Sequence, residues 1–134
     1  LMRQADVLFC KRSDAELLFS CSGEPAQQLA SLAQLSGAKT IYLTCGDSGA
    51  WMLHAGKVSS LPAVPATIVD RVGSGDAFAA GLIYGLLYLK PKEAIEFAVA
   101  AGVLKHSVPG DVLTCSLQEI QELVAGGGAG KIKR

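Results

Sequence analysis

The sequence predicts an α/β fold in which helices cover a parallel sheet. Apolar runs of strand length, such as residues 40–44, alternate with helical segments. The run 40–44 offers no polar face, which is typical of a strand covered by helices on both sides. Hydrophobic residues make up 50% of the chain and charged residues 18%, so the composition is that of a folded protein.

The first expected elements are one strand and two helices. A short apolar strand covers residues 6–10, and a helix follows over 13–19. Ser13 and Glu16 have the spacing of a capping box, which predicts the start of this helix. The segment 24–35 is rich in alanine, glutamine and leucine. Its apolar residues recur as on one helix face, so it is expected to form an amphipathic helix that ends at Ser36-Gly37.

A strand at 40–44 and a hairpin are expected next. Residues 45–49 form a tight turn after the strand. Two short strands at 50–54 and 57–61 flank Ala55-Gly56, which is a hairpin signal.

The second half of the chain is expected to be helical. A helix runs from about Asp76 to residue 89, and a second one begins at Pro91 and ends near residue 104. Residues 108–111 form a turn. Ser116 then caps a last helix, with Glu119 completing a second capping box.

Charge and cysteine content exclude several classes of function. The formal net charge of the 134 residues is zero, so no global field attracts nucleic acid or an anionic membrane. The longest apolar stretch, 77–89, is too short to span a bilayer. The N-terminus has no signal-peptide layout. The four cysteines match no zinc pattern, so we expect reduced, mostly buried thiols in a cytoplasmic protein.

The chain shows no internal repeat and no break in composition, so residues 1–134 are expected to form a single partial domain. Its few parallel strands fall short of the five or more that a doubly wound sheet usually has. We therefore expect the chain to be the C-terminal part of a larger α/β protein. The sheet edge that the missing strands would cover favours self-association, so we expect a homo-oligomer.

The stretch DRVGSGD, residues 70–76, concentrates the chemistry. Gly73, Ser74 and Gly75 lead into a helix whose first N–H groups lack partners, which predicts an anion hole. Asp76 at the same place can accept a proton from an attacking hydroxyl. The two features together are what phosphoryl transfer requires. The alternative is that Asp76 is only a helix cap on a tight turn.

Several segments carry a resemblance to one enzyme family. Residues 69–78, VDRVGSGDAF, resemble the C-terminal signature of the ribokinase-like (PfkB) sugar kinases. Residues 44–50 resemble the nucleotide loop of that family, and 97–102 its helix beside the adenine. Residues 5–9 and 14–18 resemble its strand and acidic helix. The resemblance spans nearly the whole chain but covers only the C-terminal part of a kinase.

The resemblance implies the C-terminal portion of a ribokinase-like (Rossmann-like) three-layer α/β/α fold, without its N-terminal half and lid. Within the family, residues 104–111 and 126–134 are most similar to 2-keto-3-deoxygluconate kinases. The implied reaction is ATP-dependent phosphorylation of a sugar or sugar acid at a primary hydroxyl, here 2-keto-3-deoxygluconate to its 6-phosphate. The alternatives are a kinase for another sugar, such as ribose or fructose, and a non-catalytic nucleotide-binding or interaction module. The fragment alone is expected to be inactive.

The resemblance also assigns roles to single residues. Asp76 is the implied catalytic base and contacts the sugar hydroxyl, and Asp111 is a second implied sugar contact. The implied anion hole consists of Gly73, Ser74 and Gly75, and the implied ATP contacts are Thr44, Gly46, Gly49, Ala101 and Leu104. No residue is assigned as a metal ligand, because Mg²⁺ is expected to be held by the nucleotide phosphates and water.

Five residues differ from the family pattern or carry a minor role. Asp70 matches the place that supports a monovalent cation in some relatives, but Arg71-Val72 replaces small hydroxyl residues there. Lys11 and Asp14 stand where relatives have asparagine and glutamate in a segment that bears on magnesium and phosphate. An exposed helix start is an equally weighted reading of these two residues.

The remaining conspicuous residues are expected to be structural. The segment 126–131 is not a P-loop, because Ala125 stands where the first glycine is required and Ile132 where Ser or Thr is required. The basic tail 131–134 is expected to be solvated. His54 and His106 are expected to be ordinary histidines, and a nucleotide contact is left open for His106. Trp51 is expected in the core.

Overall fold

The structure is a computed structural model that describes residues 2–126. The chain separates into two compact units, one up to Ala63 and one from Val64 onward. The single domain that the sequence predicts over 1–134 stays a prediction. The P-loop-like stretch and the basic tail lie, apart from Gly126, outside the described residues.

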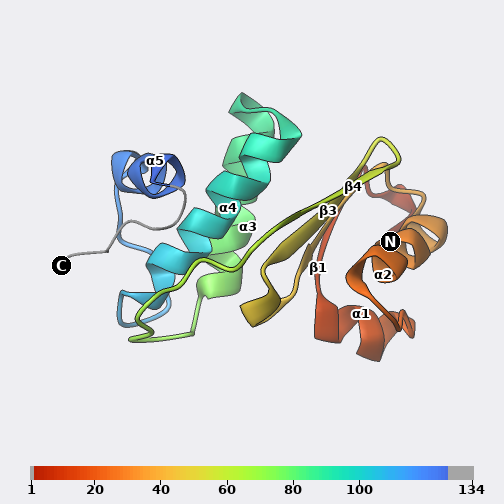
Figure 1. The fold of residues 1–134 in the computed structure, drawn as a ribbon, viewed down its shortest axis with the longest axis horizontal. Helices are drawn as coiled ribbons and strands as arrows, with labels where there is room; N and C mark the ends of the chain where they lie inside the picture. The colour runs from red at the N-terminus through yellow and green to blue at the C-terminus, as the bar shows by residue number, and fades with distance from the viewer. Residues whose placement is uncertain (1, 127–134) are drawn as a thin grey trace. The chain divides into compact units, whose positions relative to one another are not determined.

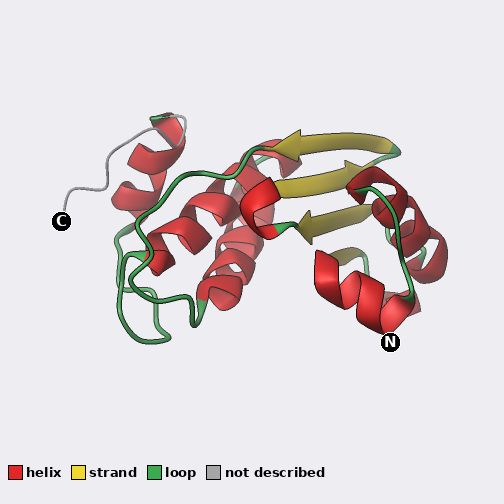
Figure 2. Ribbon diagram, turned by 60° about the horizontal axis from the view of Figure 1, so that its bottom comes forward, coloured by secondary structure: helices red, strands yellow, loops and turns green. Residues whose placement is uncertain are grey.

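The first unit is built on a four-stranded sheet with the order β1-β2-β3-β4. Only β1 and β2 are parallel, and the other two pairs are antiparallel. The parallel arrangement expected from the sequence holds for β1 and β2, and the expected hairpin is confirmed by the antiparallel pair β3 and β4. The pair β2 and β3 is also antiparallel, since the short connection after β2 can join only antiparallel neighbours. Figure 2 shows the resulting alternation of the arrows. The strands are β1 (Val7–Lys11), β2 (Thr40–Thr44), β3 (Ala50–His54) and β4 (Lys57–Leu61).

Two helices pack on one face of this sheet, α1 (Arg12–Phe19) and α2 (Pro25–Ser36). Two short 3-10 helices, η1 (Met2–Gln4) and η2 (Gly46–Ser48), complete the unit. Ile41 and Leu43 alternate along β2 and meet both helices, so one face of the strand joins the core. The buried core is formed by Ala15, Cys21, Leu29, Leu32, Ala38, Ile41 and Leu43, with Trp51 packed against it.

The predicted capping box at Ser13 is wrong. The helix begins at Arg12, immediately after β1, and its N-cap is Lys11, which makes no side-chain cap hydrogen bond. Ser13 therefore lies inside the first turn, where its hydroxyl hydrogen-bonds the Asp14 carboxylate at 3.5 Å. The expected end of α2 is confirmed, because Gly37 adopts the left-handed conformation with φ 75°.

The second unit contains α3 (Ser74–Tyr88), α4 (Pro91–His106) and α5 (Leu117–Ala125). The helices α3 and α4 lie side by side (Figure 1) and approach closely through small residues. A Cβ built on Gly81 would lie 2.9 Å from the Cβ of Ala101. The predicted capping box at Ser116 and Glu119 is confirmed. The buried core is formed by Phe97, Ala100, Ala101, Val103, Leu104, Ile120 and Leu123.

The four cysteines are all free thiols, but only Cys21 is buried, so the expectation of mostly buried thiols is wrong. The other three are half-buried. Burial raises the pKa of Cys10, Cys21 and Cys45 above the ordinary thiol value. Over residues 2–126, no helix is long and apolar enough to cross a membrane.

Candidate active site

Gly73 is the residue on which α3 begins. It is the N-cap, it adopts the left-handed conformation with φ 78°, and its carbonyl accepts the first helical hydrogen bond, from Ala77 N–H at 2.9 Å. A Cβ at this position would overlap the backbone carbonyl oxygen of Asp111. Glycine is therefore required twice, by the backbone conformation and by the close approach of a second loop.

The first turn of α3 presents backbone donors together with a carboxylate. The helix begins two residues before the expected start, so Ser74, Gly75 and Asp76 are its first three residues. Among the described residues, no acceptor pairs with the N–H groups of Gly75 and Asp76. A Cβ on Gly75 would meet nothing within 4 Å. This open helix end carries partial positive charge and can hold an anion.

Asp76 is exposed at the third helical position, and within residues 2–126 its carboxylate has no hydrogen-bond partner. The alternative interpretation, in which Asp76 only caps the helix, has no supporting hydrogen bond, since the N-cap is Gly73. The Ser74 hydroxyl instead donates to the Arg71 carbonyl at 3.0 Å. The Ser74 N–H donates to the same carbonyl at 3.4 Å, so the open donors of this turn are the N–H groups of Gly75 and Asp76, while the Asp76 carboxylate is available to a substrate hydroxyl.

Asp70 connects the segment before α3 to the turn after α4. One carboxylate oxygen accepts from Val72 N–H at 3.0 Å, and the other accepts from Gly110 N–H at 2.9 Å. These bonds, first that of Val72 and then that of Gly110, lower the pKa of Asp70, and the nearby Lys105 lowers it further. The carboxylate is thus ionised at neutral pH and committed to the backbone.

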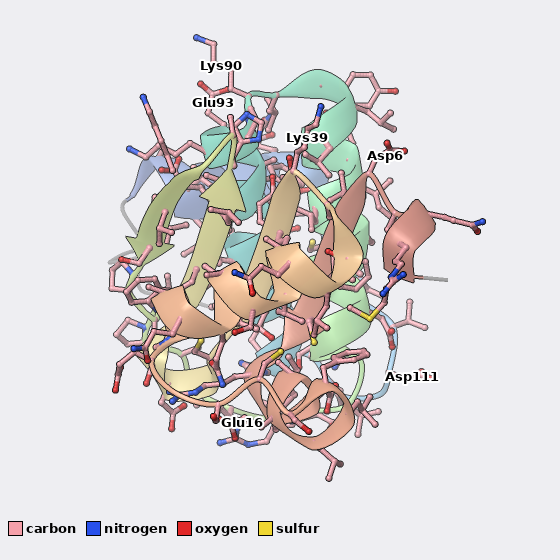
Figure 3. The ribbon with its side chains drawn as sticks, turned by 90° about the vertical axis from the view of Figure 1, so that its right-hand side faces the viewer. Asp6, Glu16, Lys39, Lys90, Glu93 and Asp111 are labelled. Carbon is pink, nitrogen blue, oxygen red and sulfur yellow. The ribbon has the colours of Figure 1, made fainter. Side chains whose placement is uncertain are left out.

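Asp111 lies beside the start of α3. Its backbone oxygen is the atom that approaches Gly73, and Gly110 before it has φ 84°. The Asp111 side chain is exposed, and Figure 3 shows it at the outer edge of the view. The structure therefore brings Asp111 next to the predicted anion hole by a main-chain contact that leaves the carboxylate accessible.

The two adenine contacts implied by the resemblance lie in α4. Ala101 is 1% exposed and Leu104 is 4% exposed, and both belong to the buried core of the second unit. Between them, a Cβ on Gly102 would lie 3.3 Å from the Ser74 carbonyl oxygen. This helix therefore supports the first turn of α3 from behind, and the adenine contacts stay a prediction.

The remaining predicted ATP contacts form a closed loop in the first unit. Thr44 ends β2, and Cys45 N–H donates to the Gly49 carbonyl at 2.8 Å. Gly46 has φ 55° and open space on its Cβ side, whereas a Cβ on Gly49 would overlap the Leu61 carbonyl oxygen. Both glycines are thus required by the backbone, and the open side of Gly46 leaves room for a ligand to approach.

Lys11 and Asp14, which differ from the family pattern, lie at the start of α1, and both are exposed. The Asp14 carboxylate accepts a hydrogen bond from the Ser13 hydroxyl at 3.5 Å. The contacts of the two side chains within the described residues fit a phosphate-binding role and an exposed helix start equally well.

His54 is structural, because its Nδ1 pairs with the Thr40 hydroxyl at 2.9 Å across β2 and β3. In the part of the chain that the structure describes, no three His, Cys, Asp or Glu residues are grouped to hold a metal ion.

Lys105 is a feature that the sequence reasoning missed. Its side chain is 0% exposed, and its ammonium donates to the Val108 carbonyl at 2.9 Å. The available signal was a single lysine at the end of the otherwise apolar stretch 97–104 of α4. Lysine is almost never fully buried without a compensating partner, so such a position calls for explanation.

The second unit therefore brings together the segment 70–76, the turn 110–111 and the end of α4. The predicted nucleotide loop 44–49 belongs to the first unit, where it is formed independently.

Comparison with known proteins agrees with these features. The model of the pfkB family carbohydrate kinases matches residues 1–117. A 2-dehydro-3-deoxygalactonokinase from Haloferax volcanii is 30% identical over 131 residues, which are 97% of this chain and 41% of that protein. A ribokinase from Haemophilus influenzae is 26% identical over 114 residues, which are 82% of this chain and 37% of that protein.

Among solved structures, the 2-dehydro-3-deoxygluconokinase from Thermotoga maritima superposes with a TM-score of 0.83 and 31% identity. The match covers 93% of this chain and 43% of that one, so the chain spans less than half the length of the proteins it resembles. The predicted fold class, a portion of the ribokinase-like α/β fold, is confirmed.

Proposed function

The chain belongs to the pfkB family of carbohydrate kinases, and we propose that it supplies the phosphate-binding and catalytic part of an ATP-dependent kinase acting on a sugar or sugar acid. The observation that carries the proposal is the first turn of α3. Its N–H groups at Gly75 and Asp76 have no acceptor among the described residues, and the Asp76 carboxylate stands exposed beside them. An anion site and a proton acceptor on one helix turn fit phosphoryl transfer.

The proposed substrate is 2-dehydro-3-deoxygluconate, also called 2-keto-3-deoxygluconate, which would be converted to its 6-phosphate. Support comes from the 31% identity to the Thermotoga maritima 2-dehydro-3-deoxygluconokinase and from the accessible Asp111 beside the anion hole. The likeness to a ribokinase makes ribose, and by the same argument fructose, the competing substrates. These alternatives share the mechanism and differ only in the acceptor.

In the proposed reaction, the Asp76 carboxylate removes the proton from the primary hydroxyl of the sugar. The hydroxyl oxygen then forms a bond to the γ-phosphorus, the bond from that phosphorus to the bridging oxygen of ADP breaks, and ADP leaves with the electron pair. The N–H groups of Gly75 and Asp76 donate to the phosphoryl oxygens as negative charge redistributes. Asp76 finally releases its proton to solvent.

The residues of the first turn of α3 and of the loop 44–49 fit a nucleoside triphosphate. The first turn of α3 provides unpaired donors and no Cβ at Gly75, so phosphate oxygens can approach the backbone. Mg²⁺ bound to the phosphates would neutralise part of their charge, held mainly by phosphate oxygens and water. The loop 44–49 is proposed to contact the nucleotide through the open side of Gly46.

We further propose that these residues act within a longer kinase chain, that it is located in the cytoplasm, and that it forms a homo-oligomer. The chain covers 41% of the Haloferax volcanii relative, and the family's two-substrate reaction needs a sugar-binding part as well as a nucleotide-binding part. The test of the proposed function therefore uses the full-length protein.

The test measures ATP-dependent phosphorylation of a panel that contains 2-dehydro-3-deoxygluconate, its galacto epimer, ribose and fructose. Asp76→Asn removes the base with little change in volume and should lower kcat by about 10²- to 10⁴-fold. Asp6→Asn is the matched control, because Asp6 is an exposed carboxylate outside the site and its variant should keep full activity.

Phosphorylation of another sugar would keep the mechanism and replace the substrate. If no sugar is phosphorylated but ATP still binds, the non-catalytic nucleotide-binding module becomes the better interpretation. An Asp76→Asn variant with wild-type kcat would refute the role of Asp76.

A further inference from the structure

A buried carboxamide in the first unit is not used by the proposed reaction. Gln28, on α2, is 0% exposed. Its Nε2 donates to Glu16 Oε1 at 2.9 Å and to the Cys21 carbonyl at 2.9 Å, so both amide N–H bonds are used. Its Oε1 is buried and accepts no hydrogen bond from the described residues. Because an unpaired buried acceptor is costly, the two bonds of Nε2, rather than packing, explain a glutamine at this position.

The partners of this amide also fix its orientation. A carboxylate and a carbonyl are both acceptors, so rotating the amide by 180° would set Oε1 against Glu16 and Cys21. Nε2 therefore ties three segments together, namely α1 through Glu16, the connection after α1 through Cys21, and α2, which carries Gln28.

Arg12 extends these contacts to the start of α1. Its Nε donates to Glu16 Oε1 at 3.4 Å, and its Nη2 donates to the Gly23 carbonyl at 3.1 Å. Glu16, labelled in Figure 3, thus stands between Arg12 and Gln28. The side chains of Arg12, Glu16 and Gln28, called the interhelix clamp below, hold the connection between α1 and α2 by its carbonyl groups at 21 and 23.

The helix that the interhelix clamp holds is short and has no side-chain cap. It has eight residues, and its N-cap, Lys11, makes no side-chain cap hydrogen bond. A helix of this length is not stable by itself, so its position depends on tertiary contacts. One such contact is the packing of Ala15 in the core, and the other is the interhelix clamp.

The start of α1 lies at the sheet edge where the loop 44–49 begins. The strands β1 and β2 are parallel neighbours, and their last residues, Lys11 and Thr44, form a register pair. Arg12 and Cys45 are the next residues along the two strands. Burial raises the pKa of the Cys45 thiol, and the positive charge of Arg12 opposes this rise, which agrees with the register.

We propose that Gln28 is a positioning residue: through the interhelix clamp it fixes the start of α1 beside Thr44 and thereby holds the loop 44–49 in the shape that meets the nucleotide. This inference rests on the proposed function, because the contact of the loop with the nucleotide is proposed there. A purely structural role, in which Gln28 only joins α1 to α2, makes different predictions.

The first test is the steady-state kinetics of Gln28→Met in the full-length kinase. Methionine keeps the length of the side chain and removes both donors. The KM for ATP should rise by about 10-fold, since misplaced contact groups weaken binding. The kcat and the KM for the sugar should change by less than about 2-fold, because the base and the anion hole lie in the other unit. Gln118→Met is the matched control, since Gln118 donates to Glu122 at 2.8 Å on the surface of α5, and its KM for ATP should stay at the wild-type value.

Variants of Glu16 test whether the effect passes through the interhelix clamp. Glu16→Gln keeps an oxygen that accepts from Gln28 and Arg12, so its KM for ATP should stay close to that of the wild type. Glu16→Met should raise this KM as Gln28→Met does, and the double variant should raise it no further. Glu16 is exposed, so Glu16→Met carries the test if Gln28→Met does not fold.

A second readout, hydrogen exchange of the nucleotide-free protein, does not depend on activity. The amides of Cys45, Ser48 and Gly49 donate hydrogen bonds within the loop 44–49 and are therefore protected. In Gln28→Met or Glu16→Met they should exchange about 10-fold faster, whereas the amides of α5 should be unchanged. If the wild type neither phosphorylates a sugar nor binds ATP, the proposed function fails, and this exchange still decides the inference.

Two results would overturn the inference. One is a wild-type KM for ATP in Gln28→Met or Glu16→Met. The other is faster exchange confined to residues 12–28, with the loop 44–49 unchanged, which is the outcome that a purely structural role predicts.

Discussion

Replacement of Gly73 by alanine tests how the start of α3 is built. Gly73 combines two constraints, a left-handed backbone with φ 78° and a contact in which any Cβ would overlap the Asp111 carbonyl oxygen. Neither constraint can be relieved by rotating a side chain, because the obstructing atom belongs to the backbone. Gly73→Ala should therefore destabilise the protein by the sum of both effects.

The magnitude follows from the two constraints. An alanine in the left-handed region costs about 1–2 kcal/mol. Forcing an extra carbon into a closely packed place costs about 1–3 kcal/mol. The expected loss is therefore about 2–5 kcal/mol, which is a large part of the roughly 5–15 kcal/mol that stabilises a typical domain.

The assay is urea unfolding of the full-length kinase, with two glycines of the same unit as controls. Gly110 has φ 84° but nothing within 4 Å of its Cβ position, so Gly110→Ala should lose only the backbone contribution of about 1–2 kcal/mol. Gly75 has neither constraint, and Gly75→Ala should be neutral or stabilising by up to about 1 kcal/mol, since alanine favours the helix.

The order of the three variants decides the argument. If Gly73→Ala and Gly110→Ala lose the same stability, the contact with Asp111 contributes nothing. If Gly73→Ala loses none, the description of the helix start is wrong. Gly75→Ala should separate stability from function, because its Cβ would enter the proposed phosphate site and lower kcat in a protein that unfolds normally.

Three further predictions concern other parts of the chain. Ser116→Ala removes the hydroxyl that accepts from Glu119 N–H at 3.2 Å and should destabilise the protein by about 1 kcal/mol in the same urea assay; an unchanged midpoint would contradict this. Burial, and after it the positive charges of Arg71 and Lys105, lower the pKa of His106 below its ordinary value of 6.5 in the folded protein. The unfolded chain therefore binds a proton at this residue more readily, so the free energy of unfolding should fall as the pH drops below 6.5. It should fall less in His106→Gln, and equal pH dependence in both proteins would refute the contribution of His106. The 134-residue chain alone should phosphorylate no sugar. It should also self-associate, and a monomer at high concentration in analytical ultracentrifugation would refute this self-association.

Elements whose signal is local were predictable from the sequence. The strands at 40–44, 50–54 and 57–61 are found within the expected bounds, because apolar runs and the turn signal Ala55-Gly56 between the last two strands need no distant information. The capping box at Ser116 is equally local. At Ser13 the same pattern failed, since β1 passes directly into α1 and leaves no room for a cap at that residue.

Features set by tertiary contacts could not be predicted. The start of α3 moved from Asp76 to Ser74 because Gly73 takes the N-cap position against Asp111, a residue 38 positions later in the sequence. The burial of Lys105 depends on the turn that brings the Val108 carbonyl to its ammonium. The candidate base and anion hole were visible as a motif, whereas the second loop that contacts Gly73 appears only in the folded chain.

The contact between Gly73 and Asp111 has a consequence for the engineering of substrate preference. It is made by the main chain of residue 111, so it does not depend on which side chain stands there. The exposed carboxylate can therefore be exchanged for other groups in a mutant library without disturbing the start of α3. Gly110 and Gly73 should be kept constant in such a library, because their backbones set the geometry that every acceptor specificity would share.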